Sequence, residues 1–181
     1  MRLFIALEFP EEAKRGIEQI QEAESQREIG WRWTGRDQLH LTMKFLGEVD
    51  EAQAARAAKL LEDVAAVGAC TLGLGGFRYL PDARRARVLA LELSGDLERL
   101  QALREQIERT FESKGFERER RPFFPHVTIA RRNERERHLR ADLYFERPWQ
   151  GVFVATELSL IQSHLNAKGA SYETLGRFSF A

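Results

Sequence analysis

The sequence contains one four-residue phrase twice, about half a chain apart. His40-Leu41-Thr42-Met43 and His126-Val127-Thr128-Ile129 both read His, apolar, Thr, apolar. Successive side chains on a β-strand point to opposite faces, so the His and Thr of each phrase share one face while the apolar pair shares the other. The repeat therefore predicts two strands, each with one face in a core and one face that carries an imidazole and a hydroxyl.

Two such strands facing each other would place two imidazoles and two hydroxyls around one small anion. The ordinary pKa of histidine is about 6.5, so near neutral pH one imidazole can be a neutral base while the other is a protonated acid. The hydroxyls of Thr42 and Thr128 can donate hydrogen bonds to phosphoryl oxygens, where charge builds up in a transition state. The repeat therefore predicts acid–base chemistry on a phosphodiester, a reaction that such a pair can perform without a metal.

Other sites that use these residue types lack their remaining parts. A metal site would need a third His, Cys, Asp or Glu near the pair, and neither motif has one within its strand. The Gly-x-Ser-x-Gly of a serine nucleophile elbow does not occur. Gly73-Leu74-Gly75-Gly76 lacks the Lys-Ser/Thr of a nucleotide-binding loop and is typical of a strand with a bulge. We assign His138 to a solvated, charged stretch and His164 to a structural or rim position.

Charge is balanced overall, with 28 acidic and 28 basic residues among 181, so net charge alone indicates no nucleic-acid partner. The basic residues are mostly arginine, whose planar fork suits phosphate. Arginines gather at Arg84, Arg85 and Arg87, and around the second motif at Arg118, Arg120, Arg121, Arg131 and Arg132. An ordinary solvated face would explain the same clusters.

The only cysteine, Cys70, excludes a disulfide framework and a cysteine-based metal site. The apolar run near the N-terminus ends at Glu8-Phe9-Pro10, too early for a signal peptide or a membrane span. We therefore expect a cytoplasmic protein without membrane association, and a monomer by default because no oligomerisation signal is evident.

Hydrophobic periodicity predicts strands and helices that alternate along one domain, residues 1–181, built of two intimate lobes. Strands are expected at Arg2–Glu8, Leu39–Leu46, Thr71–Phe77, Arg87–Leu93, Phe123–Ala130, Val152–Ser163 and Ser171–Phe180. Helices are expected after Pro10, after an N-cap at Asp50 with Gln53 three residues on, and from Asp96 to a C-terminal Gly115. This order indicates an α+β fold in which the two motifs belong to related lobes.

The chain resembles the RNA 2′,3′-cyclic phosphodiesterases, also called 2′-5′ RNA ligases, of the two-histidine phosphoesterase superfamily. The residues that carry the resemblance span nearly the whole chain. They are Arg2–Leu7, the signature His40–Val49, the signature Phe124–Arg131, and Leu160–Ser163 with Gly169, Tyr172 and Leu175 near the end. Met43 stands where the family often has Leu, which is a packing change.

The resemblance implies a bilobal α+β fold, with two pseudo-symmetric lobes whose antiparallel sheets line a central cleft and whose helices lie outside. It implies hydrolysis of terminal RNA 2′,3′-cyclic phosphates to 2′-phosphomonoesters without a metal or cofactor. Carried over by position, His40 is the proton donor and His126 is the proton acceptor. Thr42, Thr128 and Arg131 hold the phosphate.

Two further candidates depend on how far strict strand alternation persists. It would put Arg131 on the face opposite His126, although Arg131 could still reach the phosphate if the strand ended near Ala130. It would likewise put Phe45 on the face opposite His40, where a core position and a substrate contact are equally consistent. Both residues are candidates for contacts with the substrate.

Aromatic residues near the motifs are candidates for contacts to a nucleobase, because an aromatic face accepts any base. Phe124 shares the face of the histidine two residues later and is expected to stack on the substrate. Tyr172 could supply a hydroxyl or simply pack. Trp31 and Trp33 fit a core or rim position better than a ligand platform.

Alternative functions remain open at this level. The same site could ligate tRNA-like halves through 2′-5′ bonds, which is the reverse direction of the same chemistry. It could act on a small cyclic nucleotide, or hold phosphorylated RNA ends without catalysis. Substrate size would depend on the loops at residues 78–87 and 132–147, whose pattern indicates no particular structure.

Overall fold

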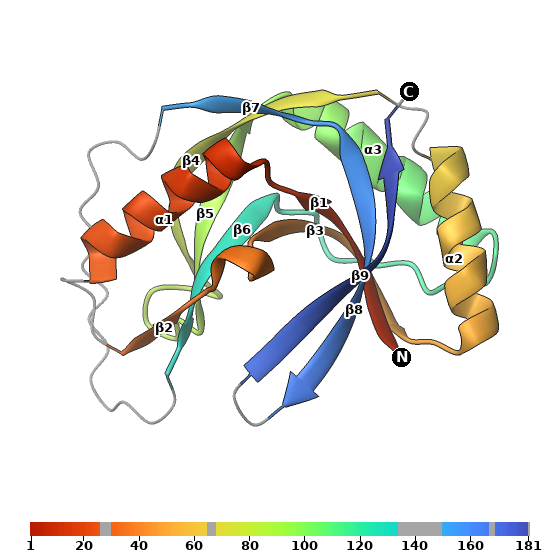
Figure 1. Cartoon of the computed structure of the whole chain (residues 1–181), viewed down its shortest axis with the longest axis horizontal. Coiled ribbons are helices and arrows are strands. Elements are labelled where there is room, and N and C mark those ends of the chain that lie inside the picture. Colours follow the sequence, from red (N-terminus) through yellow and green to blue (C-terminus); the bar gives the residue numbers. More distant parts are fainter. Residues whose placement is uncertain (26–29, 65–67, 134–149, 167–168, 181) are drawn as a thin grey trace.

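A computed structural model describes residues 1–25, 30–64, 68–133, 150–166 and 169–180 (Figure 1). Its helices are α1 (Glu11–Ser25), η1 (Arg36–Gln38, a single 3-10 turn), α2 (Glu51–Val64) and α3 (Leu97–Glu112). Its strands are β1 (Arg2–Glu8), β2 (Trp31–Trp33), β3 (His40–Glu48), β4 (Cys70–Leu80), β5 (Val88–Gly95), β6 (His126–Arg132), β7 (Val152–Ala155), β8 (Glu157–Asn166) and β9 (Gly169–Ser179). The predicted strands and helices follow one another in the expected order, but the structure adds the short strand β2 and divides one predicted strand near the C-terminus.

The described strands form one curled antiparallel sheet in the order β7-β4-β5-β6-β3-β1-β8-β9, with β2 paired to β6. The two motif strands, β3 and β6, lie side by side at its centre and are joined by the single ladder pair Leu41 and Val127. The two expected sheets are therefore halves of one sheet that meet at the motifs. Each half takes strands from both halves of the chain.

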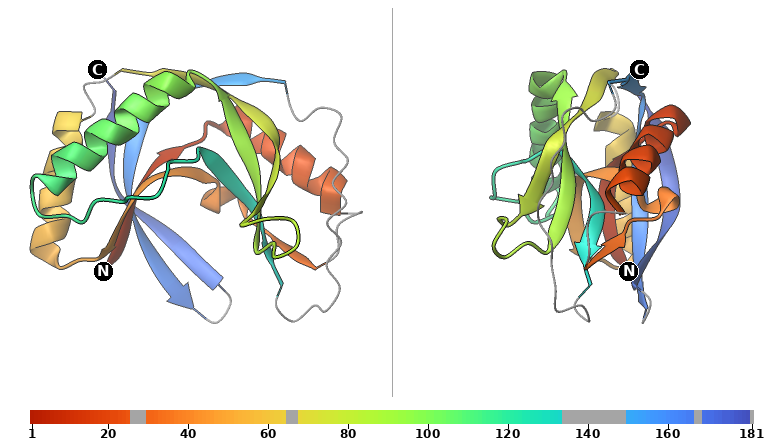
Figure 2. Two further views of the ribbon diagram at one scale, coloured as in Figure 1. Left: turned by 180° about the vertical axis from the view of Figure 1, so that it is seen from behind. Right: turned by 90° about the vertical axis from the view of Figure 1, so that its left-hand side faces the viewer.

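Helices cover the outside of both halves (Figures 1 and 2). Helix α1 packs against β2 and β7, whereas α2 packs against β8 and β9, and α3 against β3 and β4. The buried stripe of α3 includes Leu100, Ile107 and Phe111 as expected, but Leu97 at its start is 38% exposed. No helix in the described part of the chain is long and apolar enough to cross a membrane.

Two helix caps follow the sequence signals and one does not. At α2, the Gln53 N–H donates to Asp50 Oδ1 at 2.7 Å and the Asp50 N–H donates to Gln53 Oε1 at 3.0 Å, which is a reciprocal capping box. Gly115 after α3 has a φ of +87°, as a glycine C-cap requires. Asp96, however, makes no side-chain bond to α3, because its carboxylate accepts the Thr71 N–H of β4 at 2.8 Å.

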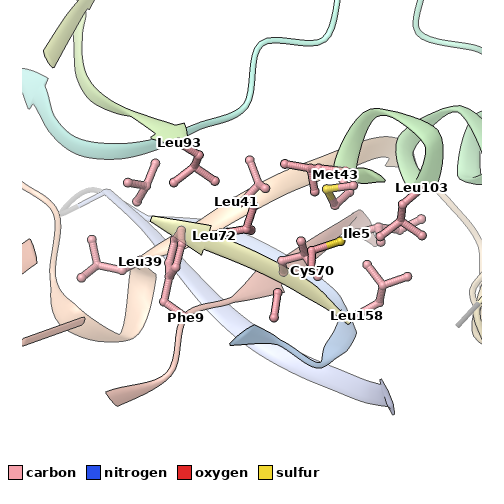
Figure 3. Packing of buried hydrophobic residues seen from close by; sticks show 14 of the residues in the cluster. Ile5, Phe9, Leu39, Leu41, Met43, Cys70, Leu72, Leu93, Leu103 and Leu158 are labelled. Atoms are coloured by element: carbon pink, nitrogen blue, oxygen red, sulfur yellow. The ribbon is translucent and has the colours of Figure 1, made fainter. Parts of the chain in front are cut away.

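The apolar residues of the two motifs enter one continuous core. Leu41 and Met43 are each 1% exposed, and Val127 and Ile129 are fully buried. They pack in the same cluster as residues from both half-sheets and from α3, including the labelled Leu103 (Figure 3). The prediction that each motif buries its apolar face is confirmed.

The single strand predicted at Val152–Ser163 is wrong. The chain breaks at Thr156 into β7, which pairs with β4, and β8, which pairs with β1 at the other side of the sheet. Val152 and Val154 also face outward, at 68% and 49% exposed, while Phe153 is buried. Both segments alternate in hydrophobicity, and the sequence does not show that their partner strands differ.

Candidate active site

The ladder between β3 and β6 sets the two motifs against each other. Its one pair joins the apolar residues that lie between each His and Thr. Continuing the antiparallel register by one residue in each direction sets His40 opposite Thr128 and Thr42 opposite His126. Side chains opposite each other on one face lie about 5 Å apart at Cβ. The two motifs are therefore related by a pseudo-twofold axis that passes through the Leu41–Val127 pair.

Both imidazoles are held in the same tautomer. His40 Nδ1 lies 2.7 Å from the Gln38 carbonyl oxygen, and His126 Nδ1 lies 2.7 Å from the Phe124 carbonyl oxygen. A carbonyl oxygen only accepts, so each Nδ1 carries the hydrogen and Nε2 is left to exchange a proton. His40 Nε2 lies 3.1 Å from the Thr42 hydroxyl oxygen. In both motifs Nε2 is thus the ring nitrogen that is not bonded to a backbone carbonyl.

These side chains open into a cleft of about 990 Å³, a volume in the range that holds a nucleotide-sized ligand. Most of the predicted site residues line it, namely His40, Thr42, Phe45, His126, Thr128, Arg131 and Tyr172. Phe124, which was predicted to contact the substrate, is not among the described residues that line the cleft.

Arg131 reaches the cleft because β6 breaks its alternation. Ile129 and the following Ala130 are both fully buried, so two consecutive residues face the core. The ladder to β5 shifts register at the same place, between Leu89 and Ala90. This bulge turns Arg131 to the face of the motif side chains, and the placement expected from strict alternation is wrong.

The same break occurs in β3. Met43 and Lys44 are both buried, and the ladder to β1 shifts between Ile5 and Ala6. The next residue, Phe45, is 61% exposed and lines the cleft. Phe45 therefore shares the face of the motif side chains rather than the core face. It occupies the position in the first motif that Arg131 occupies in the second.

The electrostatic environment of His40 favours its neutral form. Burial lowers the pKa of His40 to about 4, and the charge of Arg131 contributes in the same direction, although the bond to the Gln38 carbonyl opposes them. The ring also packs against Phe4, with centroids 4.9 Å apart, and edge-on against Tyr172 at 5.3 Å. At neutral pH the imidazole of His40 is therefore uncharged.

Phe124 supports His126. Its ring lies nearly parallel to the imidazole, with centroids 5.4 Å apart and an interplanar angle of 21°. The Arg78 guanidinium carbon lies 4.6 Å from the centroid of the same ring, and Arg78 in turn pairs with Glu92, the neighbour of His126 across the β5–β6 ladder. Through its ring and its carbonyl, Phe124 fixes the imidazole. Sequence reasoning missed Arg78, which has no motif to mark it.

Sequence reasoning also missed a buried ionic cluster behind the sheet. Lys44 Nζ donates to Glu108 Oε2 at 2.7 Å and to the Glu117 carbonyl oxygen at 2.6 Å. Glu108 also pairs with Arg104, and its Oε2 accepts the N–H of Glu119 at 3.2 Å. The cluster ties the bulge of β3 to α3 and to the segment that leads into β6. The one feature of the sequence that could have indicated this cluster is Lys44 itself, a lysine within an apolar strand.

Of the two remaining histidines, His164 is described by the structure and does not line the cleft. His164 Nε2 is 3.2 Å from Glu173 Oε2 on the exposed β8–β9 hairpin. His138 lies outside the described residues. Within the residues that are described, no three His, Cys, Asp or Glu side chains come together as a group that could hold a metal ion.

A curled antiparallel sheet with paired His-x-Thr strands at the centre of a cleft defines the chain as a LigT-like two-histidine phosphoesterase by fold. TT0787 of Thermus thermophilus superposes with a TM-score of 0.83 at 26% sequence identity, covering 99% of this chain and 98% of that one. Escherichia coli LigT in complex with 3′-AMP superposes with a TM-score of 0.80 at 25% identity, covering 99% and 97%.

The chain belongs to the 2′-5′ RNA ligase superfamily, whose sequence profile matches residues 9–167. A Thermotoga maritima protein named RNA 2′,3′-cyclic phosphodiesterase is 34% identical over 132 residues, 72% of this chain and 70% of that protein. A Bacillus subtilis protein of the same name is 31% identical over 151 residues, 83% of this chain and 81% of that protein. The resemblance inferred from the two signatures is confirmed.

Proposed function

We propose that this protein hydrolyses the 2′,3′-cyclic phosphate at the end of an RNA to a 2′-phosphomonoester. The observation that carries the proposal is the pair of His-x-Thr strands, which direct two Nε2 atoms and two hydroxyls into one cleft beside the Arg131 guanidinium. The names of the Thermotoga and Bacillus relatives support the same activity and the same RNA substrate.

In the proposed reaction, His126 Nε2 takes a proton from a water molecule whose oxygen attacks the phosphorus. The new P–O bond forms as the bond from phosphorus to O3′ breaks, and His40 Nε2 donates its proton to O3′. Thr42, Thr128 and Arg131 stabilise the charge that develops on the non-bridging oxygens. The chemistry requires no cofactor, and the products are a 2′-phosphomonoester and a 3′-hydroxyl.

The proposed role of His40 as proton donor requires substrate to change its protonation. The charge of Arg131 is one cause of the low pKa of His40. A bound phosphate anion would offset that charge and add an opposite charge near the imidazole, and both effects raise the pKa of His40. Protonation would then follow binding. The reverse assignment, with His40 as base, would need no such change.

The test is incubation of EDTA-treated protein with a short RNA that ends in a 2′,3′-cyclic phosphate. We expect a 2′-phosphomonoester from the wild type and no product from His40→Ala or His126→Ala. Turnover retained in both variants would refute the paired-histidine site. No product from the wild type would reject the RNA-end substrate and favour a small cyclic phosphate or a binding role.

Ligation through 2′-5′ bonds is the second candidate, favoured by the pseudo-twofold symmetry of the motifs. Reversal of the reaction exchanges the acid and base roles, and the two imidazoles have the same tautomer and the same type of carbonyl partner. Supplying RNA halves with 2′,3′-cyclic phosphate and 5′-hydroxyl ends tests it. Absence of joined product under conditions that support hydrolysis would count against ligation.

A further inference from the structure

A second arginine begins beside Arg131 on the cleft wall. Arg32 of β2 is the ladder partner of Arg131 in β6. Directly paired residues of an antiparallel ladder point to the same face, with Cβ atoms about 5 Å apart. Arg32 is exposed and lines the same cleft as both motifs.

Arg32 also reaches the opposite wall of the cleft. A Cβ added to Gly169, at the start of β9, would lie 3.1 Å from Arg32 Nη1 and 3.3 Å from Nη2. Beside this contact, the Gln38 side chain bonds the carbonyl of Ala170, while the Gln38 backbone carbonyl accepts the His40 Nδ1 hydrogen. The guanidinium of Arg32 is therefore held between the β2–β6 wall and the β8–β9 hairpin, on the rim next to the catalytic pair.

The cleft carries enough positive charge to bind more than one phosphate. Among the described residues that line the cleft, the arginines are Arg2, Arg32, Arg121 and Arg131, and the single carboxylate is Glu119. Glu119 pairs with Arg121 at 2.7 Å. One reacting phosphate engages Arg131, and Arg32 adds a second positive charge that a further anionic group can approach.

We propose that Arg32 binds the phosphodiester on the 5′ side of the terminal nucleoside, and so makes the protein prefer RNA ends over cyclic mononucleotides. This inference rests on the proposed function and specifies its substrate class. A 2′,3′-cyclic mononucleotide with a free 5′-hydroxyl has one phosphate, which the motifs and Arg131 engage. An RNA end has the next phosphate one nucleotide away, and a guanidinium can hold it through charge-assisted hydrogen bonds.

The test compares kcat/KM for a 2′,3′-cyclic mononucleotide and for a dinucleotide that ends in a 2′,3′-cyclic phosphate. We expect Arg32→Gln to lower kcat/KM about tenfold for the dinucleotide, the size of one lost charged contact, and to leave the mononucleotide within about twofold. Arg32→Lys keeps the charge and should restore much of the dinucleotide activity. Arg15→Gln makes the same change at an exposed position of α1 and should leave kcat/KM unchanged for both substrates.

Each other result overturns the inference. An equal loss on both substrates would mean that Arg32 acts only by holding the β8–β9 hairpin or the reacting phosphate. No loss on either substrate would mean that it does not contact RNA. If the wild type turned over neither substrate, the proposed function itself would fail, so the two failures are distinguishable.

Discussion

The histidines and threonines of the two motifs line one cleft, and each imidazole is held by groups that lie two residues away in its own segment. Each Nδ1 is occupied by the carbonyl two residues upstream, and His40 Nε2 lies 3.1 Å from the Thr42 hydroxyl. The Thr42 hydroxyl can therefore orient His40 Nε2 before binding and donate to the phosphate during the reaction. For these four residues, the sequence alone predicted which side chains share a face, because His and Thr two residues apart on a strand point to the same side.

Removing the Thr42 hydroxyl should lower turnover more than substrate affinity. Thr42→Val keeps the shape and strand preference of the side chain, so the loss isolates the hydrogen bond to the developing charge. We expect kcat for a cyclic-phosphate RNA to fall about 100-fold, the usual effect of one such donor. Steady-state kinetics measure this, with Thr71→Val on an exposed position of β4 as the control. A change of less than about twofold in kcat would contradict the role.

The low pKa of His40 should appear as pH-dependent stability. In the unfolded chain this imidazole gains a proton as the pH falls below about 6.5, whereas in the folded protein it does so only near pH 4. The unfolded state therefore binds more protons in this window, and folding stability falls as the pH falls. Relative to His40→Gln, the wild type should lose about 2 to 3 kcal/mol of unfolding free energy between about pH 7 and about pH 4.5.

Urea unfolding at the two pH values measures this difference. His164→Gln on the exposed hairpin is the matched control and should follow the wild type. If the wild type and His40→Gln lost stability in parallel, the folded protein would not suppress protonation of His40.

At the scale of strands, the paired bulges decide which residues join the site. Alternation predicted the motif strands and their buried faces, because apolar and polar residues alternate there over four positions. It failed at Lys44 and Ala130, where a second consecutive residue is buried. A bulge depends on the neighbouring strands, and the burial of Lys44 depends on Glu108, which comes from a distant helix. Phe45 and Arg131 therefore could not be placed from local pattern alone.

The Lys44 ion pair should be essential for the stability of the bulge in β3. Lys44 and Glu108 have side chains 0% and 3% exposed, and removal of one partner leaves a buried charge with weaker compensation. We expect Lys44→Met to lower the unfolding free energy by about 3 kcal/mol, toward the low end for buried pairs because Arg104 still contacts Glu108. Urea denaturation measures the unfolding free energy. The control Lys59→Met, at an exposed position of α2, should change it by less than about 0.5 kcal/mol. Equal effects would show that the pair contributes no net stability.

At the scale of the whole molecule, the sequence did not predict which strands from distant parts of the chain pair with each other. The break at Thr156 sends β7 and β8 to opposite sides of the sheet, although their hydrophobic patterns are similar. As a result, each half of the sheet contains strands from both halves of the chain. The cleft that contains the motifs is therefore built where the two halves meet, and its geometry depends on the entire fold.

This arrangement predicts that the protein unfolds in one cooperative step rather than lobe by lobe. One buried cluster includes Leu41 of β3, Val127 of β6 and residues from both half-sheets, so neither half keeps a complete core without the other. Tryptophan fluorescence, which reports partly on Trp31 and Trp33 of β2, and far-UV circular dichroism, which reports on helices over both halves, should give the same urea midpoint. Val127→Ala, which removes packing at the joint, should lower both midpoints together. Separate transitions in either protein would show that the two halves fold independently and that the cleft can open by losing one of them.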